Sequence, residues 1–169
     1  MLVFLDTEFT QFEVPELISI ALVAEDGREF YAESTSYTRD KCSGFVRETV
    51  VPLLGRVRGA ACSRTELPER LTEWFQGLGE SSIVVYDFAT DWHLLAAAMR
   101  GRESTSPINQ YAAALHLNGY TICHPEFEKA QRAIYTPEWP LHHALADARA
   151  LMAGYRAWRL FMDKIWRIE

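Results

Sequence analysis

The first ten residues hold the feature that most limits the fold, a short apolar run that ends in two acidic residues. Residues 2–5 read LVFL, and their branched and aromatic side chains favour a strand. Because side chains alternate between the faces of a strand, Asp6 and Glu8 share one face and Thr7 lies on the other. Two carboxylates this close resist being ionised together. Either one keeps a proton, or water solvates both, or a cation lies between them.

The rest of the chain alternates between strand and helix patterns. Residues 1–34 are predicted to form three antiparallel strands, with Asp26 and Gly27 in a hairpin turn. A short helix is expected to end at Pro52 and Gly55, and 82–86 reads as a buried strand. Longer helices are expected at 65–75, 90–100, 109–118 and 141–164. We therefore predict one α/β domain over residues 1–169, with a central mixed β-sheet flanked by α-helices.

Composition and charge narrow the class of protein. The chain has 169 residues, shows no apolar stretch of the ~20 residues that a membrane span needs, and lacks the layout of a cleavable leader. Three widely spaced cysteines predict reduced thiols and hence a cytoplasmic protein. The net charge of −6 argues against a protein that coats long nucleic acid, but not against an enzyme that holds a short end.

Two further acidic residues lie in helical patterns. Asp91 follows the strand at 82–86, where a carboxylate also suits the first turn of a helix through the helix dipole. Asp147 lies at the edge of an apolar stripe in the last helix, where an unpaired carboxylate is costly. An ion pair with Arg149 or Arg100 is the alternative explanation for Asp147.

Carboxylates from three separated segments suit hard divalent cations such as Mg²⁺. Two such ions about 3.5–4 Å apart can stabilise the attacking and leaving oxygens of a phosphoryl displacement. This chemistry also needs a group that takes a proton from water, and histidine is suited to it. The chain offers His142 and His143, but Pro137 and Pro140 precede them, so helical geometry does not choose between the two. A surface or capping position is the alternative for each.

Three motifs together resemble the DEDDh exonucleases, which include ribonuclease T, oligoribonuclease and the proofreading subunit of bacterial DNA polymerase. They are DTE on the first strand, an aspartate followed by WHLL after a central strand, and HHALADA on the last helix. The layout is most similar to the small mycobacterial-type 3′–5′ exoribonuclease-like group. This resemblance implies a ribonuclease H-like fold for the single exonuclease domain.

The resemblance also implies a catalytic set. Two Mg²⁺ or Mn²⁺ ions are expected to be held by four carboxylates, those of Asp6, Glu8, Asp91 and Asp147. His142, five residues before Asp147, is then the general base, and His143 is a bystander.

Substrate contacts follow from the same resemblance. Phe9, directly after the glutamate, is expected to wedge or stack the terminal base together with Thr7, although a core position is the alternative for Phe9. One departure concerns the middle motif, where Asp87 and Thr90 replace the usual asparagine and aromatic residue. Asp87 is therefore either an indirect or alternative ligand, or a solvated carboxylate at a strand end.

The sequence thus predicts a metal-dependent 3′–5′ exoribonuclease that releases nucleoside 5′-monophosphates from the 3′ end of single-stranded or short RNA. A proofreading or repair type of DNA exonuclease, and a catalytically silent nucleic-acid-binding module, are the alternatives. Arg56, Arg58 and Arg132 are candidate contacts to RNA, with solvated surface charge as the favoured alternative. A homodimer is also implied, and the aromatic tail YRAWRLFMDKIW offers apolar surface for it unless the tail belongs to the core.

Overall fold

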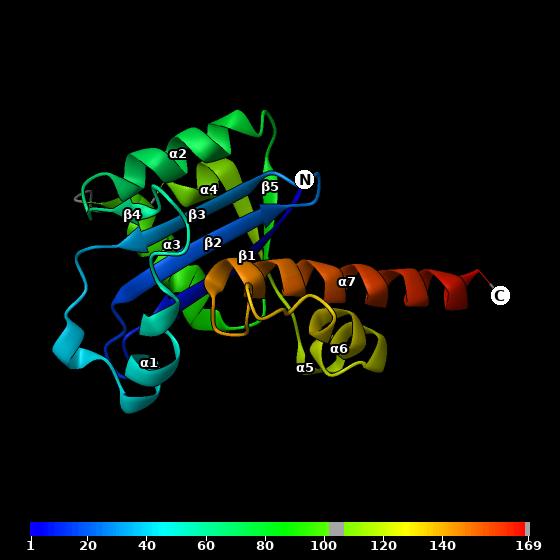
Figure 1. Cartoon of the computed structure of the whole chain (residues 1–169). Coiled ribbons are helices and arrows are strands. Elements are labelled where there is room, and N and C mark those ends of the chain that lie inside the picture. Colours follow the sequence, from blue (N-terminus) through cyan, green and yellow to red (C-terminus); the bar gives the residue numbers. More distant parts are fainter. Residues whose placement is uncertain (102–106, 168–169) are drawn as a thin grey trace.

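Six strands form one mixed sheet in the computed structural model, which describes residues 1–101 and 107–167 (Figure 1). The strand order is β4-β3-β2-β1-β5-β6. The strands are β1 (Leu2–Phe9), β2 (Leu17–Ala24), β3 (Glu29–Ser34), β4 (Ala61–Cys62), β5 (Ser82–Tyr86) and β6 (Ala112–His116). The β1-β2 and β2-β3 pairs are antiparallel, whereas the β3-β4, β1-β5 and β5-β6 pairs are parallel. The predicted α/β class with a mixed sheet is confirmed, and the arrangement is consistent with a ribonuclease H-like fold.

Helices cover both faces of this sheet (Figure 1). Helices α2 and α3 pack on one face, and α7 lies across β1 and β2 on the other, with α6 packed against it. The α-helices are α1 (Gly44–Thr49), α2 (Leu67–Gly77), α3 (Ala89–Arg100), α4 (Ile108–Tyr111), α5 (Gly119–Ile122), α6 (Pro125–Arg132) and α7 (Ala144–Trp166). Two 3-10 turns, η1 (Arg39–Lys41) and η2 (Val51–Leu53), flank α1.

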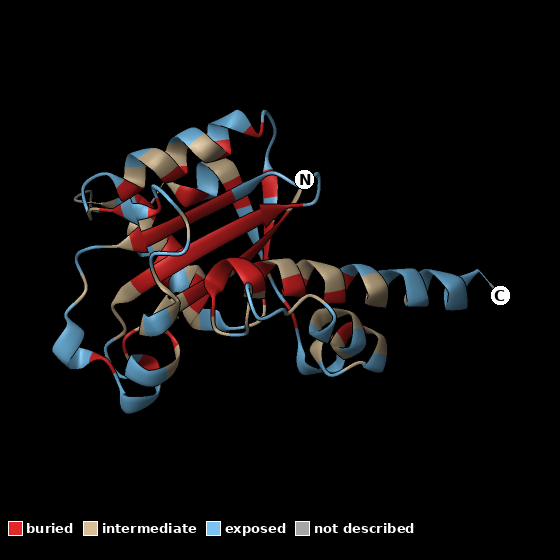
Figure 2. Cartoon of the chain, viewed as in Figure 1, coloured by how far each residue is buried: buried red, intermediate tan, exposed pale blue. Residues whose placement is uncertain are grey.

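The alternation of side chains along β1 divides the core in two. Val3 and Leu5 are buried under α2 and α3, whereas Phe4 is buried with Leu151 and Tyr155 of α7. The sheet and the first turns of α7 are therefore the most buried parts of the molecule (Figure 2). This alternation continues into the polar end of the strand and decides which helix each of the following residues faces.

The antiparallel unit at residues 1–34 is confirmed, and Gly27 in its turn has the positive φ of 95° that glycine adopts readily. The helix expected at 109–118 is wrong, because only Ile108–Tyr111 is helical and Ala112–His116 is strand β6. Alanine favours a helix, but this weak preference is overridden by the parallel ladder that the segment forms with β5. Helices α5 and α6 were not predicted.

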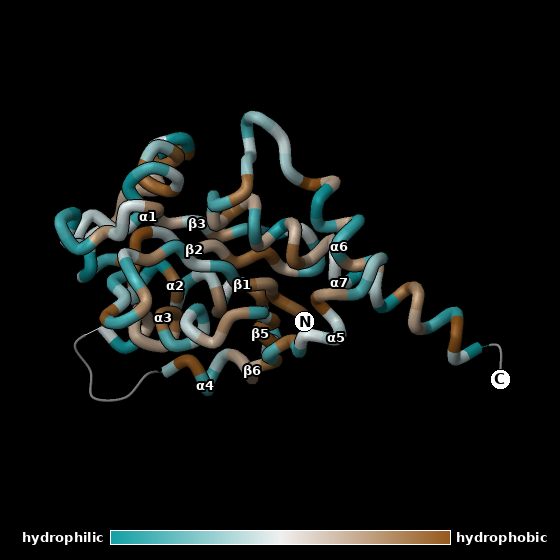
Figure 3. Tube along the Cα trace, turned by 90° about the horizontal axis from the view of Figure 1, so that it is seen from below, coloured by the Kyte–Doolittle hydropathy of each residue, from teal (hydrophilic) through white to brown (hydrophobic). Residues whose placement is uncertain are grey.

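Helix α7 begins at Ala144 against the sheet and extends beyond the body of the molecule (Figure 3). Small side chains at Ala144 and Ala148 are fully buried and allow this close approach. The far end is different, since Leu160 and Trp166 are 63% and 68% exposed. The last turns of the aromatic tail are thus on the surface and not in the core.

Among the described residues, no helix combines the length and the apolar character that crossing a membrane requires.

The contact between α6 and α7 yields a stability prediction. A Cβ atom added at Gly154 of α7 would lie 2.7 Å from the ring of Phe127, which is fully buried in α6. We expect Gly154→Ala to lower the free energy of unfolding by about 1–3 kcal/mol, because a packed ring has to move. Urea denaturation measures this change.

Gly77→Ala is the matched control, because an added Cβ there meets no atom within 4 Å. Its stability should stay the same or rise slightly through helix propensity. Equal stability of the Gly154→Ala variant and the unchanged protein would contradict the tight packing of α6 on α7.

Candidate active site

The polar end of β1 opens into a cleft of about 650 Å³. Asp6 and Glu8 lie on the face of β1 that α7 covers, and Thr7 lies on the face that α3 covers, as the strand alternation predicts. The cleft lies where β1 and the parallel strand β5 both end, at the edge where α/β folds commonly bind ligands.

Helix α3 brings Asp91 to this edge. The helix follows β5 directly, so its first turn comes to lie beside the end of β1. Asp91 is only 2% exposed, and its Oδ1 accepts a hydrogen bond of 2.6 Å from the hydroxyl of Thr7. Thr7 therefore holds Asp91 in place, and its predicted contact with substrate stays a prediction.

Helix α7 brings Asp147 to the same edge from the opposite face of the sheet. Asp147 lies in the first turn of α7, and its Oδ2 accepts a hydrogen bond of 2.9 Å from the backbone N–H of His142. The ion pair with Arg149 that was one explanation of Asp147 is not formed. Arg149 instead pairs with Glu29 at 2.7 Å.

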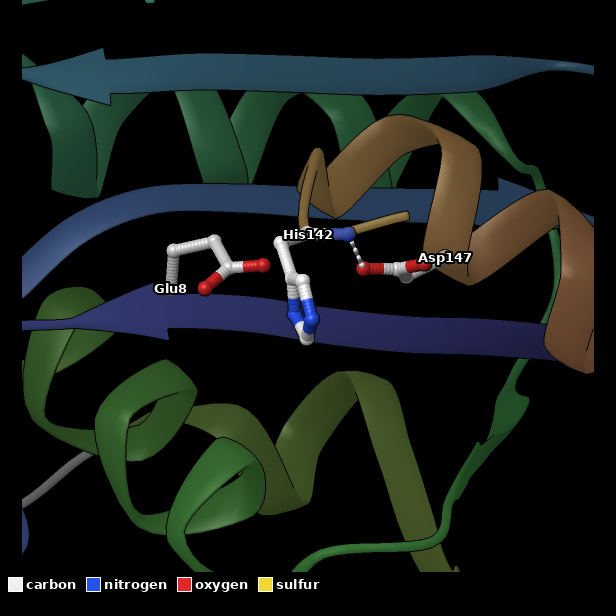
Figure 4. A group of neighbouring side chains, drawn as sticks. All are labelled: Glu8, His142 and Asp147. Carbon is white, nitrogen blue, oxygen red and sulfur yellow. Dashed lines mark hydrogen bonds between the residues drawn. The ribbon is translucent and has the colours of Figure 1, made fainter. Parts of the chain in front are cut away.

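His142 faces the cleft next to two of these carboxylates. One ligand atom each from Glu8, His142 and Asp147 lies within 4.8 Å of the others. Figure 4 shows the imidazole over β1 between the two acidic side chains. The ring also contacts the edge-on ring of Phe45 in α1, with centroids 5.0 Å apart. The structure thus brings together the carboxylates and the histidine that the sequence singled out.

The neighbouring His143 has a different environment. It is 2% exposed and stacks on Tyr31 of β3 with ring centroids 4.9 Å apart. It is therefore neither a surface histidine nor a side-chain cap of α7. Sequence geometry did not separate the two histidines, whereas the structure places only His142 in the cleft.

Burial and mutual repulsion control the protonation of the carboxylates. Burial, followed by the charges of Asp147 and Asp91, raises the pKa of Glu8 to about 9. Burial raises the pKa of Asp91 to about 7 although the bond from Thr7 opposes it. The pKa of Asp6 is raised well above its ordinary value by burial and then by Asp147, Asp91 and Glu8.

For Asp147, burial raises the pKa to about 6, against the hydrogen bonds from Tyr135 and from the backbone of His142. Oδ2 of Asp6 and Oδ1 of Asp147 are buried and have no hydrogen-bond partner within the described residues. Buried carboxylate oxygens without a donor fit a cation that would neutralise them. The donor set is therefore suited to divalent metal ions.

Two residues near these carboxylates add to the predicted set. Tyr135 lines the cleft next to Asp147, and no feature of the sequence pointed to it, because no element was predicted after residue 118 and before 141. Asp87 also lines the cleft, and burial raises its pKa. Its charge acts on Asp6, Asp91 and Asp147, so it belongs to the same electrostatic cluster.

Aromatic side chains form one rim of the cleft. The rings of Phe9 and Phe88 are nearly parallel with centroids 6.2 Å apart, and Phe12 contacts both edge-on. Phe12 is 75% and Phe88 45% exposed. We call Phe9, Phe12 and Phe88 the aromatic rim. Exposed rings beside a polar cleft can stack on flat ligands.

Two of the three candidate arginines, Arg56 and Arg132, are bound to the protein itself. Arg56 donates to the backbone oxygen of Glu138 at 2.7 Å, and Arg132 pairs with Glu128 at 3.0 Å. Contacts from these arginines to a ligand stay predictions.

Comparison with known proteins identifies relatives that match most of the chain. No family model matches it. Two curated proteins from two strains of Mycobacterium tuberculosis, both named 3′-5′ exoribonuclease, are each 49% identical to this chain over 165 residues. Each match covers 90% of this chain and 90% of the relative.

The raised pKa values predict how stability depends on pH. The pKa values of Asp147, Asp91 and Glu8 in the folded protein are about 6, 7 and 9. Between pH ~4 and ~9 these carboxylates therefore bind more protons in the folded protein than in the unfolded chain, and the stability that their protonation contributes is lost as the pH rises through each folded pKa. We expect the thermal midpoint of the metal-free protein to fall steadily from pH 5 to pH 9.

Added Mg²⁺ or Mn²⁺ should raise this midpoint, and more at pH 9 than at pH 5, because a cation favours ionised carboxylates. Asp6→Asn should reduce both the pH slope and the effect of metal, whereas Asp163→Asn, on the exposed end of α7, should leave them unchanged. A midpoint that rises with pH in the absence of metal would contradict this electrostatic account.

Proposed function

This chain belongs to the family of the mycobacterial 3′-5′ exoribonucleases, and we propose on this premise that it is itself a metal-dependent exoribonuclease. In this proposal it hydrolyses phosphodiester bonds at the 3′ end of single-stranded or short RNA and releases nucleoside 5′-monophosphates. One structural observation supports this proposal independently of the relatives. Carboxylates from β1, α3 and α7 converge with a histidine on a single cleft.

Four carboxylates would hold two Mg²⁺ or Mn²⁺ ions, those of Asp6, Glu8, Asp91 and Asp147. The unpartnered buried oxygens of Asp6 and Asp147 support this assignment. Bound ions of this kind stabilise the attacking and the leaving oxygen of an in-line displacement at phosphorus. Asp87 is close enough to influence the charge of the set and would act on it indirectly.

His142 would act as the general base. Burial lowers the pKa of its imidazole, so the ring is neutral at pH 7 and can accept a proton from the attacking water. The hydrogen bond from its backbone N–H to Asp147 fixes the end of the loop before α7 relative to the carboxylates. Tyr135, whose pKa is raised mainly by burial, keeps its proton at neutral pH and can donate it in a hydrogen bond to Asp147.

The aromatic rim would hold the terminal base of the substrate. Stacking on Phe12 and Phe88 needs no particular base and little positive charge, which suits a chain of net charge −6. Phe9, which the sequence predicts to wedge or stack the terminal base, also lines the cleft and contacts both of these rings. The names of the relatives favour RNA over DNA as the polymer.

We further propose that residues 1–169 form one exonuclease domain that pairs as a homodimer. The exposed apolar end of α7, with Leu160 and Trp166, is the surface that supports this proposal. Sedimentation equilibrium would then give about twice the chain mass of 19.4 kDa.

The central test uses end-labelled single-stranded RNA and DNA of the same sequence with Mg²⁺ or Mn²⁺. We expect stepwise shortening from the 3′ end that is faster on RNA and stops when metal is removed. Asp6→Asn should abolish the activity, and His142→Ala should lower kcat by about 10²–10⁴-fold, as loss of a general base does.

His93→Ala is the matched control, since His93 is exposed on α3, and it should keep full activity. Absence of cleavage of either polymer with any ion would refute the enzyme and favour the nucleic-acid-binding module. Faster shortening of DNA would instead favour the DNA exonuclease.

The aromatic rim yields a separate prediction. Phe12→Ala should weaken binding of the RNA end by about 1–3 kcal/mol, the usual contribution of one stacked base, and should raise KM more than it lowers kcat. Tyr120→Ala removes an aromatic ring that is 92% exposed outside the cleft and should leave KM unchanged. Equal KM values for the two variants would show that the aromatic rim does not bind the substrate.

A further inference from the structure

The backbone of His142 has an unusual conformation. Its φ of 68° lies in the left-handed region, and no other non-glycine residue among those described has a positive φ. This conformation is unfavourable for a residue with a side chain, so neighbouring contacts have to hold it. The hydrogen bond from the His142 N–H to Asp147 is one such contact. This bond holds the N–H on the N-terminal side of His142. The backbone on its C-terminal side has to be held through the next residue, His143.

The side chain of His143 behaves as a flat apolar ring. It is 2% exposed, and neither of its ring nitrogens has a hydrogen-bond partner in the described part of the chain. Burial, followed by the charge of Arg56, lowers its pKa to about 4, so the ring is neutral at pH 7. A buried polar ring without a partner is unfavourable by itself, and its packing therefore has to compensate.

Two aromatic rings form a slot for His143. Tyr31 stacks on it with centroids 4.9 Å apart and an interplanar angle of 24°. Trp139 lies edge-on at 5.1 Å and 87°. The imidazole thus contacts one nearly parallel ring and one nearly perpendicular ring, and these two contacts limit its rotation.

The Tyr31 side of the slot is fixed by a buried carboxylate. The hydroxyl of Tyr31 donates to Oε1 of Glu33 at 2.9 Å, and both oxygens of Glu33 accept from the backbone N–H of Gly55 at 2.9 Å. Tyr31 is therefore tied to the loop after η2 as well as to β3.

The Trp139 side is fixed by its own turn and by a cation. Thr136 and Trp139 exchange two hydrogen bonds of 3.0 Å. The guanidinium of Arg149 lies 4.6 Å from the Trp139 ring and is held by two bonds of 2.7 Å to Glu29. Both sides of the slot are thus part of the folded body and do not depend on the cleft.

We propose that His143 is a positioning residue for His142. Its ring, locked between Tyr31 and Trp139, anchors the chain directly after His142, holds that residue in its left-handed conformation and so directs the His142 imidazole toward Glu8 and Asp147. The part of this inference that concerns catalysis rests on the proposed role of His142 as general base. The part that concerns the backbone does not.

Two substitutions separate ring packing from nitrogen chemistry. His143→Phe keeps a flat ring and removes both nitrogens, whereas His143→Ala empties the slot. His143→Leu, which keeps apolar volume without a flat face, replaces the alanine variant where that one lacks a cooperative unfolding transition. Leu71→Ala, in a fully buried position of α2 on the opposite face of the sheet, is the control for general destabilisation.

Two readouts are needed, and one is independent of activity. Amide hydrogen exchange of His142, followed by NMR, reports the bond from its N–H to Asp147. Steady-state cleavage of RNA gives kcat and KM separately. We expect His143→Ala to speed exchange at His142 at least about tenfold and to lower kcat by about 10–100-fold with KM unchanged, because a displaced base costs rate and not binding.

His143→Phe is expected to keep both the exchange rate of the His142 amide and kcat within about threefold of the unchanged protein. Leu71→Ala is expected to keep the kcat of the unchanged protein, and its His142 amide should still exchange slowly. The proposal is overturned if His143→Phe is as impaired as His143→Ala, because the nitrogens would then matter. It is equally overturned if the emptied slot leaves exchange at His142 unchanged, or if Leu71→Ala lowers kcat as much.

Failure of the proposed function gives a different pattern. If His142→Ala keeps full activity while His143→Ala still speeds exchange at His142, the slot holds the backbone as proposed but His142 is not the general base.

Discussion

Repulsion among buried and half-buried carboxylates at the end of β1 is the constraint on which the rest of the structure depends. Asp6 and Glu8 share one face of a central strand, and helices α3 and α7 bring Asp91 and Asp147 to the same edge. Such a cluster opposes folding unless protons or cations neutralise it. The hydrophobic layers on both faces of the sheet supply the stability that tolerates this unfavourable arrangement.

Neighbouring residues of β1 contact different helices because they lie on opposite faces of the strand. The residues of one face contact α7 and its preceding loop, which carries His142. On the other face, the hydroxyl of Thr7 donates a hydrogen bond to Asp91 of α3 and holds it in place. One strand therefore aligns two helices that do not follow each other in the chain. Each of these two helices begins at the site and packs against the sheet behind it.

The strand pattern of the first 34 residues, the α/β class and the shared face of Asp6 and Glu8 could be predicted because period-two patterns and turn residues are local signals. Strand β6 could not, since its alanines favour a helix and only the ladder with β5 makes it a strand. Nor could Tyr135, which reaches Asp147 through a turn without a periodic pattern. Only the resemblance chose His142 over His143, through its spacing to Asp147. Helical geometry could not separate them, because their difference depends on a left-handed backbone and a slot built from distant residues.

The raised pKa values of the cluster have a consequence for metal binding itself. Carboxylates that are protonated in the metal-free protein have to release those protons before they coordinate a cation. Metal binding at the proposed site would therefore exchange protons for metal, and the apparent affinity for metal would rise with pH. The heat of such binding would include the ionisation heat of the buffer that takes up the protons. A weakly buffered solution of the protein would turn more acidic as metal is added.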